Sequence, residues 1–358
     1  MAEARRWPAA AVLALLLELA AAPGCARMVT LSEPNEAYLD AMAEATRHAH
    51  HGRLEEAVRA YGRAAGVADR RVDRDEARYR QAKALQELGR TEEALVVLED
   101  LAAARPPSRR TARSCFDAAL IRHQRGHRER ALTGFRQVVD EHPDSGLGGR
   151  ALYYLLDHHR EHDDVDGALR LLESLYPELR DTTLGDDVLH HRARLLLARG
   201  DRDGARATLE TLVENHPYPQ GHRWDDALVE LADMAEEDGD PERAIGYLES
   251  LVQRRDTTTM VGSYTLPSMP KAQLRIARLY RDAVGDAEAA AAAFERMAAD
   301  YPRSILRDDA LFELGVLRLE QDRRGEACDL FERVTREYEV GHARRKARAH
   351  LKEHCGRP

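Results

Sequence analysis

Apolar and polar positions in this chain follow one long period. An alanine recurs every 37 residues from Ala57 to Ala205, and after gaps of 39 and 46 residues it recurs once more at 37. A large apolar residue follows each alanine by four positions, and Gly or Asp precedes it by five. In chain order the alanines are Ala57, Ala94, Ala131, Ala168, Ala205, Ala244, Ala290 and Ala327, the apolar residues are Tyr61, Leu98, Phe135, Leu172, Leu209, Leu248, Phe294 and Phe331, and the preceding residues are Gly52, Gly89, Gly126, Asp163, Gly200, Gly239, Gly285 and Asp322. Eight copies of one unit predict a solenoid of stacked repeats.

Each unit is predicted to form two helices joined by a tight turn. Gly or Asp ends the first helix, because a residue that adopts a left-handed conformation satisfies the last carbonyl groups. In the second helix, apolar residues at the alanine and at four and seven positions beyond it form one face, as in Ala57, Tyr61 and Ala64. Prolines follow the alanine by twelve residues in several units, at Pro106, Pro143, Pro217 and Pro302. Since alternating β-branched runs are missing, we expect an all-α fold with no sheet.

The repeat unit resembles that of the tetratricopeptide repeat family. The small residue on the first helix of that family is matched at Ala45, Ala82, Ala119, Ala193, Ala232, Ala277 and Gly315. The fourth repeat departs from this pattern with Leu156, so we expect its two helices to lie further apart. The resemblance implies a right-handed α-α superhelical solenoid of about eight helix pairs over residues 35–340. An insertion at about 254–269 is expected to form a surface loop, and a basic capping helix and tail are expected over 341–358.

In the family that the chain resembles, the first helices line a concave groove. Counting back 15 residues from each alanine gives one column on that face, at Met42, Tyr79, Phe116, Tyr153, His190, Val229, Leu274 and Phe312. Nearby positions are basic in repeats 2 to 4 and carry acids such as Asp187 and Asp226 in repeats 5 and 6. The predicted partner-binding residues are Tyr79, Lys83, Arg113, Phe116, Arg150, Tyr153 and Arg160. Aromatic and guanidinium groups together suit a peptide that carries carboxylates. The alternative is that the column packs between neighbouring repeats.

The N-terminus has the layout of a secretory signal. Arg5 and Arg6 precede an apolar run and then small residues, which predicts a signal peptide over 1–24 and a tether over 25–34. The sequence before Cys25 resembles the lipobox at which bacterial lipoproteins are cleaved and acylated on cysteine. Under this hypothesis the protein lies in the periplasm, tethered to the outer membrane by a lipidated Cys25. The alternative is a plain cleaved signal and a soluble secreted or periplasmic protein.

Three further cysteines and the net charge bear on the cellular compartment and on the class of partner. Cys115 falls on an apolar helix face and is expected to be buried. Cys328 and Cys355 flank the end of the last repeat and the terminal helix, where an oxidising compartment would allow them to pair, although helix geometry leaves this open. A formal charge of −9 argues against general nucleic-acid binding.

Candidate catalytic and metal-binding patterns are weak. His158 and His162 are spaced to share a helix face, but a zinc site needs three or four convergent ligands, so surface histidines are the expected interpretation. No nucleophile, phosphate-binding, dinucleotide-binding or metalloprotease motif occurs. We therefore expect no enzyme activity, no cofactor and no metal.

The sequence predicts a non-catalytic protein-interaction scaffold of the bacterial cell envelope. It resembles the lipoprotein of the outer-membrane β-barrel assembly machine and the periplasmic repeat protein that works with the Tol-Pal system. The expected partner is an envelope protein or peptide, with membrane contact only through the lipid anchor. The alternative is a structural component of an outer-membrane assembly, secretion or motility complex that acts through oligomerisation.

Overall fold

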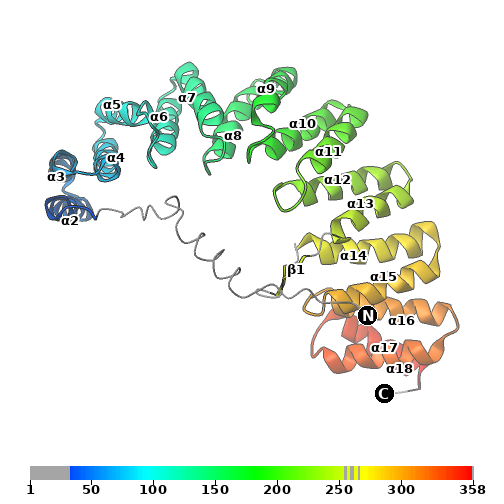
Figure 1. Cartoon of the computed structure of the whole chain (residues 1–358). Coiled ribbons are helices and arrows are strands. Elements are labelled where there is room, and N and C mark those ends of the chain that lie inside the picture. Colours follow the sequence, from blue (N-terminus) through cyan, green and yellow to red (C-terminus); the bar gives the residue numbers. More distant parts are fainter. Residues whose placement is uncertain (1–32, 254–255, 259–261, 265–266, 357–358) are drawn as a thin grey trace, which may run out of the picture. The chain divides into compact units, whose positions relative to one another are not determined.

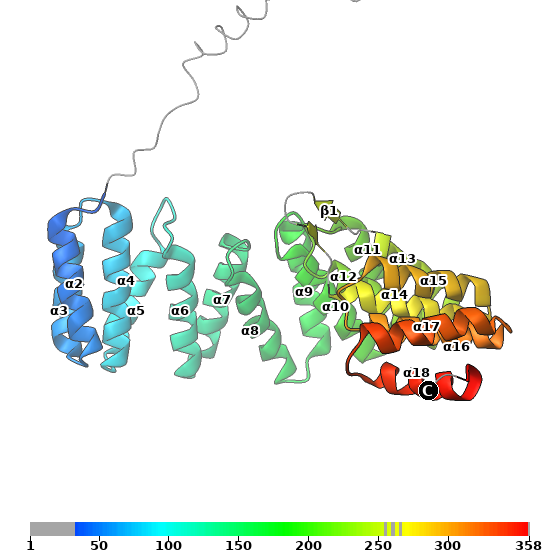
Figure 2. The same ribbon diagram turned by 90° about the horizontal axis from the view of Figure 1, so that it is seen from below.

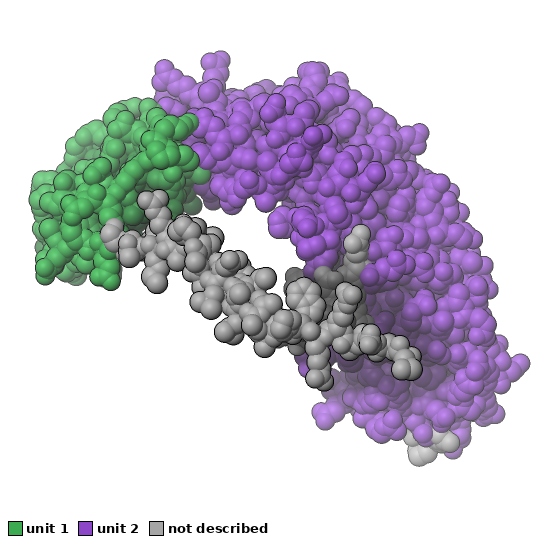
Figure 3. All heavy atoms as spheres, in the orientation of Figure 1, with its two compact units in different colours: residues 1–114 green, residues 115–358 purple. Residues whose placement is uncertain are grey.

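The computed structural model describes residues 33–253, 256–258, 262–264 and 267–356. The predicted signal peptide, Cys25 and most of the predicted tether lie outside these residues. The chain divides into two compact units, Met1–Ser114 and Cys115–Pro358, drawn in different colours in Figure 3.

Both units are built from consecutive helices that pack in pairs (Figure 1). The first unit contains α2 (Glu36–His50), α3 (Leu54–Val67), α4 (Arg71–Glu87), α5 (Thr91–Ala102) and the start of α6 (Thr111–Gln124). The second unit holds the rest of α6 and continues with α7 (Arg128–Glu141), α8 (Gly148–Arg160), α9 (Val165–Leu179), α10 (Gly185–Arg199), α11 (Arg202–Asn215), α12 (Trp224–Glu237), α13 (Pro241–Gln253), α14 (Ser268–Leu279), α15 (Ala287–Asp300), α16 (Arg307–Glu320), α17 (Arg324–Glu337) and α18 (His342–His354). The predicted all-α repeat fold of eight helix pairs and a terminal helix is confirmed.

The turns inside the pairs fall where the sequence predicts them. All eight Gly or Asp positions have a positive φ, from 51° at Asp163 to 86° at Gly200. This left-handed conformation ends the first helix of each pair and lets the chain reverse. Asp163 and Asp322 adopt it in place of glycine, which Asp tolerates better than most residues.

The periodic alanines lie in the contact between the two helices of each pair. All eight are at most 3% exposed, and the large apolar residues four positions later are at most 4% exposed. The close approach is clearest in the third repeat, where a Cβ built on Gly134 of α7 would lie 2.8 Å from the Cβ of Ala119 in α6. Small residues therefore set the spacing of the helices, and the larger neighbours fill the core.

The seventh repeat contains one extra residue between the small residue of its first helix and the periodic alanine of its second helix. Ala277 precedes Ala290 by 13 residues, whereas the corresponding distance in the second repeat, from Ala82 to Ala94, is 12. The structure accommodates this residue in a π-helical turn, Tyr280–Val284, directly after α14. A π-turn adds one residue to a helix without changing the faces on either side, so the pair still closes at Gly285.

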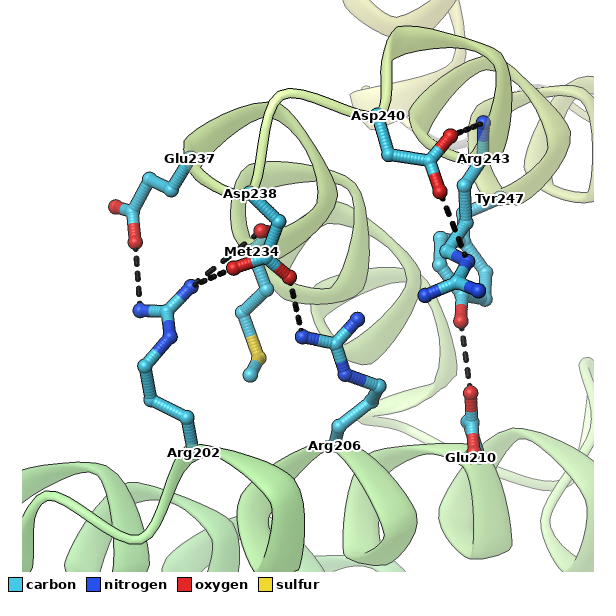
Figure 4. A network of polar contacts seen from close by, with 9 residues as sticks. All are labelled: Arg202, Arg206, Glu210, Met234, Glu237, Asp238, Asp240, Arg243 and Tyr247. Atoms are coloured by element: carbon cyan, nitrogen blue, oxygen red, sulfur yellow. Dashed lines mark hydrogen bonds and ion pairs between the residues drawn. The ribbon is translucent and has the colours of Figure 1, made fainter.

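Neighbouring repeats are linked by ion pairs whose two partners lie about one repeat apart in the sequence. Arg202 and Arg206 of α11 contact Asp238, which follows α12, at 3.0 and 2.5 Å (Figure 4). Tyr247 of α13 donates a hydrogen bond to Glu210 of α11 at 2.8 Å. Burial and this hydrogen bond raise the pKa of Tyr247 to about 12. Exposed ion pairs contribute little stability, so the apolar contacts between helices supply most of the stabilisation. The apolar contacts and the ion pairs together fix how neighbouring repeats align.

The insertion between the sixth and seventh repeats is not a simple loop. Strand β1 (Asp256–Thr258) pairs in antiparallel fashion with β2 (Gly262–Tyr264), with Thr257 opposite Ser263. The expectation of no sheet is therefore wrong for this segment. Two three-residue strands form only a local hairpin, so the fold class is unchanged.

The last helix covers the end of the stack. Ala343, Ala347 and Leu351 of α18 are buried in a cluster with residues of α16 and α17, and Figure 2 shows these three helices side by side. Cys328 and Cys355 form a disulfide bond between α17 and the end of α18. The sequence left this pairing open. Within the described residues, no helix is both long enough and apolar enough to span a membrane.

Candidate partner-binding surface

The predicted residues of the first unit are largely engaged in intramolecular contacts. Tyr79 is 8% exposed, and the guanidinium carbon of Arg110 lies 4.4 Å from the centre of its ring. The Lys83 ammonium donates a hydrogen bond to Gln86 at 2.7 Å. Arg113 is half-buried at the start of α6. Tyr79 thus offers little ring surface to a partner, and its contacts fit a packing role.

Phe116 and Arg150 form a stacked pair in the second unit. Phe116 is fully buried against Phe135 and Tyr154, with ring centres 5.5 and 6.1 Å apart. The Arg150 guanidinium lies 4.7 Å from the centre of the Phe116 ring. The prediction that Phe116 contacts a partner is corrected here, because neighbouring side chains already cover its ring. Arg150 remains exposed on its outer side.

One aromatic member of the predicted column is exposed. The side chain of Tyr153 in α8 is 55% exposed, whereas Phe312 at the same position of the eighth repeat is 8% exposed. In the fourth repeat the next residue, Tyr154, packs inward instead and stacks on Phe135 at 4.4 Å with nearly parallel rings. Tyr153 is consequently left on the surface, where its ring meets that of Tyr154 edge-on with 6.1 Å between the ring centres.

A cavity of about 400 Å³ opens beside Tyr153, between α8, α9 and α10. Its apolar lining consists of Tyr153, Leu156, Val165, Ala168 and Leu195. Leu156 stands where the other seven repeats have Ala or Gly, and the cavity forms beside this larger residue. The expectation that the fourth repeat would be wider at Leu156 agrees with this opening. A volume of this size is in the range of about 300–1,000 Å³ that ligand sites occupy.

Polar groups surround the apolar lining in defined pairs. Arg160 forms an ion pair with Asp157 one turn earlier on α8. His159 Nδ1 lies 2.9 Å from Asp164 Oδ2, and the backbone N–H of Gly167 donates to the other oxygen of Asp164 at 2.8 Å. The bond to His159, followed by that to Gly167, lowers the pKa of Asp164. Asp164 is therefore charged at neutral pH, and both carboxylates are engaged by neighbouring groups.

The α10 side of the cavity differs from the α8 side. Burial lowers the pKa of His191, so this imidazole is uncharged at neutral pH. Arg194 is exposed, and its guanidinium makes no hydrogen bond or ion pair with any residue in the described part of the chain. Arg194 is thus the cation at the cavity that is available to an incoming acidic group.

The predicted change from basic to acidic residues along the first helices is weaker than the sequence suggests. Arg223 lies 2.8 Å from Asp187 and 3.3 Å from Asp226. Arg275 of α14 likewise contacts two further acids of the sixth repeat, Asp233 and Glu236, at 2.6 Å each. The prediction of an acidic stretch is corrected, because arginines neutralise these carboxylates. Arg223 and Arg275 each contact acids of the preceding repeat, and Arg223 also pairs with Asp226 of its own repeat.

The histidines near the cavity do not converge on a metal site. The rings of His158 and His162 lie 4.7 Å apart, but His162 Nδ1 faces the carbonyl oxygen of His158 at 2.7 Å. Across residues 33–253, 256–258, 262–264 and 267–356, no group of three or more His, Cys, Asp or Glu side chains could hold a metal ion.

Of the seven predicted groove residues, Tyr153 and Arg160 line one cavity, while Phe116 and Arg150 pack on each other. Counting along one helix face missed Val165 and Leu195, which come from α9 and α10. The signal that could have located the site was Leu156, the single departure from the small residue of the first helix.

Two family models match the sequence, and both are described as a tetratricopeptide repeat. One matches residues 191–258 and 229–305, and the other matches 76–108, 116–145 and 309–339. Residues 146–190, which contain α8 and α9, lie between the matched ranges. No curated protein matches the chain.

Solved structures of similar fold share little sequence with the chain. A tetratricopeptide repeat protein from Parabacteroides merdae is 14% identical, with 79% of this chain and 99% of that chain covered and a TM-score of 0.33. The C-terminal part of a repeat-containing protein from Cytophaga hutchinsonii is 15% identical, with 75% and 99% covered and a TM-score of 0.40. Pseudomonas aeruginosa pilF is 16% identical, with 66% and 95% covered and a TM-score of 0.35.

The family assignment rests on the sequence matches and on the repeat architecture. The matched ranges together span more than half of the 358 residues. Repeats of this kind generally mediate protein–protein interaction and form non-catalytic scaffolds. With eight helix pairs that all keep the turn, and seven that keep the small residue of the first helix, this chain belongs to the tetratricopeptide repeat family.

Proposed function

We propose that this protein is a non-catalytic scaffold of a bacterial cell envelope that binds a partner protein or peptide on the first-helix face of its second unit. The observation that carries the proposal is the cavity of the fourth repeat, where an exposed Tyr153 stands beside an apolar opening of about 400 Å³. Exposed aromatic rings next to arginines are typical anchors of protein interfaces.

Two features support the envelope as the location. The first is the predicted signal with Cys25 at its end, which would place the mature chain in the periplasm on a lipid anchor at the outer membrane. The second is the pairing of Cys328 with Cys355, because disulfides persist mainly in oxidising compartments such as the bacterial periplasm. Both features are independent of the partner-binding surface.

Affinity capture from envelope extracts tests the binding function. The unchanged protein should recover a discrete partner, and Tyr153→Ala should recover much less of it. Ile305→Ala is the matched control, because Ile305 is 89% exposed in the same unit but lies in the connection before α16. Equal recovery by all three proteins would refute the assignment of the surface.

Metabolic labelling with a palmitate analogue tests the anchor separately. Label is expected on the unchanged protein and lost in Cys25→Ala. A mature protein that carries no label would be a plain secreted protein, and the binding function would stand without the anchor.

A further inference from the structure

The cavity of the fourth repeat has a chemistry that restricts what can occupy it. Its walls are apolar side chains from three helices, among them Leu156 of α8, Val165 of α9 and Leu195 of α10. An apolar cavity open to the surface gains free energy when an apolar group displaces water from it. Tyr153 adds an exposed ring at the rim, which suits contact with another aromatic or aliphatic side chain.

The charged groups at the rim are not equivalent. Asp157 is neutralised by Arg160, and Asp164 accepts hydrogen bonds from His159 and from the backbone of Gly167. Two charged side chains at the rim make no hydrogen bond or ion pair within the described residues: the carboxylate of Asp163, in the turn before α9, and the guanidinium of Arg194 on α10. Of these two groups, Arg194 is the one that can hold an acidic group. A guanidinium binds a carboxylate through two parallel hydrogen bonds and therefore selects it over a neutral or cationic group.

We propose that this cavity binds one large apolar side chain of a partner polypeptide, with an Asp or Glu next to it in the partner sequence contacting Arg194. The inference rests on the proposed function and specifies its partner: an internal segment with an apolar residue beside an acid. Leu156, which replaces the small residue of the other repeats, supplies part of the apolar wall of the cavity. Alanine at this position therefore removes contact surface from an apolar side chain that occupies the cavity.

Methyl NMR on the full-length protein with labelled Leu and Val tests this directly. The probes are Gly/Ser-rich peptides, acetylated and amidated at their ends so that no terminal charge contributes, with Phe-Glu, Phe-Gln, Phe-Lys or Ala-Glu at the centre. The Phe-Glu peptide should shift the methyl signals of Leu156, Val165 and Leu195. We expect it to bind at least tenfold tighter than Ala-Glu and several-fold tighter than Phe-Gln or Phe-Lys.

Variants separate the two parts of the site. Leu156→Ala should weaken Phe-Glu binding about tenfold or more, the ratio expected when a site for one apolar side chain is lost. Arg194→Gln, an exposed change that leaves the core intact, should abolish the preference for Phe-Glu over Phe-Gln. Arg170→Gln on the exposed side of α9 is the control and should change neither. Circular dichroism and thermal melting establish that each variant is folded.

Four results would overturn the inference. The first is a preference for Phe-Lys, which would assign recognition to Asp163. The others are shifts at methyl groups outside the cavity, no shifts at millimolar peptide concentration, and unchanged peptide binding by Leu156→Ala. If peptides fail while Tyr153→Ala still loses the captured envelope partner, the ligand chemistry is wrong and the scaffold function stands. If Tyr153→Ala captures the same partner as the unchanged protein, the proposed function fails with it.

Discussion

Cys328 of α17 and Cys355, the residue that follows α18, form a disulfide bond across 27 positions of sequence with their Cα atoms 5.9 Å apart. The bond holds the terminal helix on the apolar cluster that contains Phe331 and Leu351. In a repeat protein the end of the stack is its weakest interface, because a terminal helix has a neighbour on one side only. The disulfide therefore strengthens the end of the second unit.

We predict that Cys355→Ser loses about 3.5 kcal/mol of stability at this end, the amount expected for a closed loop of this length. Denaturation of the unchanged protein and the variant, with and without reductant, measures it. Reductant should lower the stability of the unchanged protein to that of Cys355→Ser and leave the variant unchanged. Equal stability of all four samples would show that α18 does not depend on the bond.

Two glycines inside helices should respond to alanine in opposite ways. Alanine at Gly134 would place its Cβ 2.8 Å from that of Ala119, so Gly134→Ala should destabilise the protein by about 1–3 kcal/mol. Gly246 of α13 has open space around the same position, so Gly246→Ala should stabilise by roughly 0.5–1 kcal/mol through helix propensity. Urea denaturation compares them, and a tolerated Gly134→Ala would mean that the third pair is not closely packed.

Stability should fall as the pH drops below the ordinary histidine pKa. Burial lowers the pKa of His158, His191, His216 and His350 below 6.5 in the folded chain. Between the folded and unfolded pKa values the unfolded chain binds more protons, so the free energy of unfolding rises with pH. The stability contributed by these neutral histidines is fully present above about pH 6.5 and decreases as the pH falls below that value.

Urea denaturation at about pH 5.5 and at about pH 7.5, on either side of the histidine pKa, measures the effect. His216→Gln is the informative variant, because His216 is 8% exposed and its Nε2 has no hydrogen-bond partner among the residues that the structure describes. The variant should show a smaller difference between the two pH values. A protein that is equally stable or more stable at the lower pH would contradict this prediction.

Local chemistry made the repeat predictable from sequence. The left-handed turns at Gly52 and Asp322 and the buried Ala57 and Phe331 follow from rules that involve a few neighbouring residues. The π-turn before Gly285 was hidden, since one extra residue can be absorbed in a loop or within a helix. The hairpin at Thr257 and Ser263 was missed because two short strands carry no clear alternation.

The candidate site was only partly predictable, because exposure depends on the neighbouring helices. Phe116 and Tyr153 occupy the same position of successive repeats, yet one is fully buried and the other is 55% exposed. The difference arises from Arg150, which covers Phe116, and from Tyr154, which takes the inward place in the fourth repeat. Such pairings between repeats cannot be counted along a single helix.

The central claim is that partners bind on the first-helix face beside Tyr153, and site-specific photocrosslinking in the organism that encodes the protein tests it most directly. A photoreactive phenylalanine analogue replaces Tyr153 of α8 in one strain and the exposed Arg170 of α9 in another. The account predicts a discrete crosslinked partner from position 153 and none from position 170. No adduct at 153, or the same adducts at both positions, would contradict it.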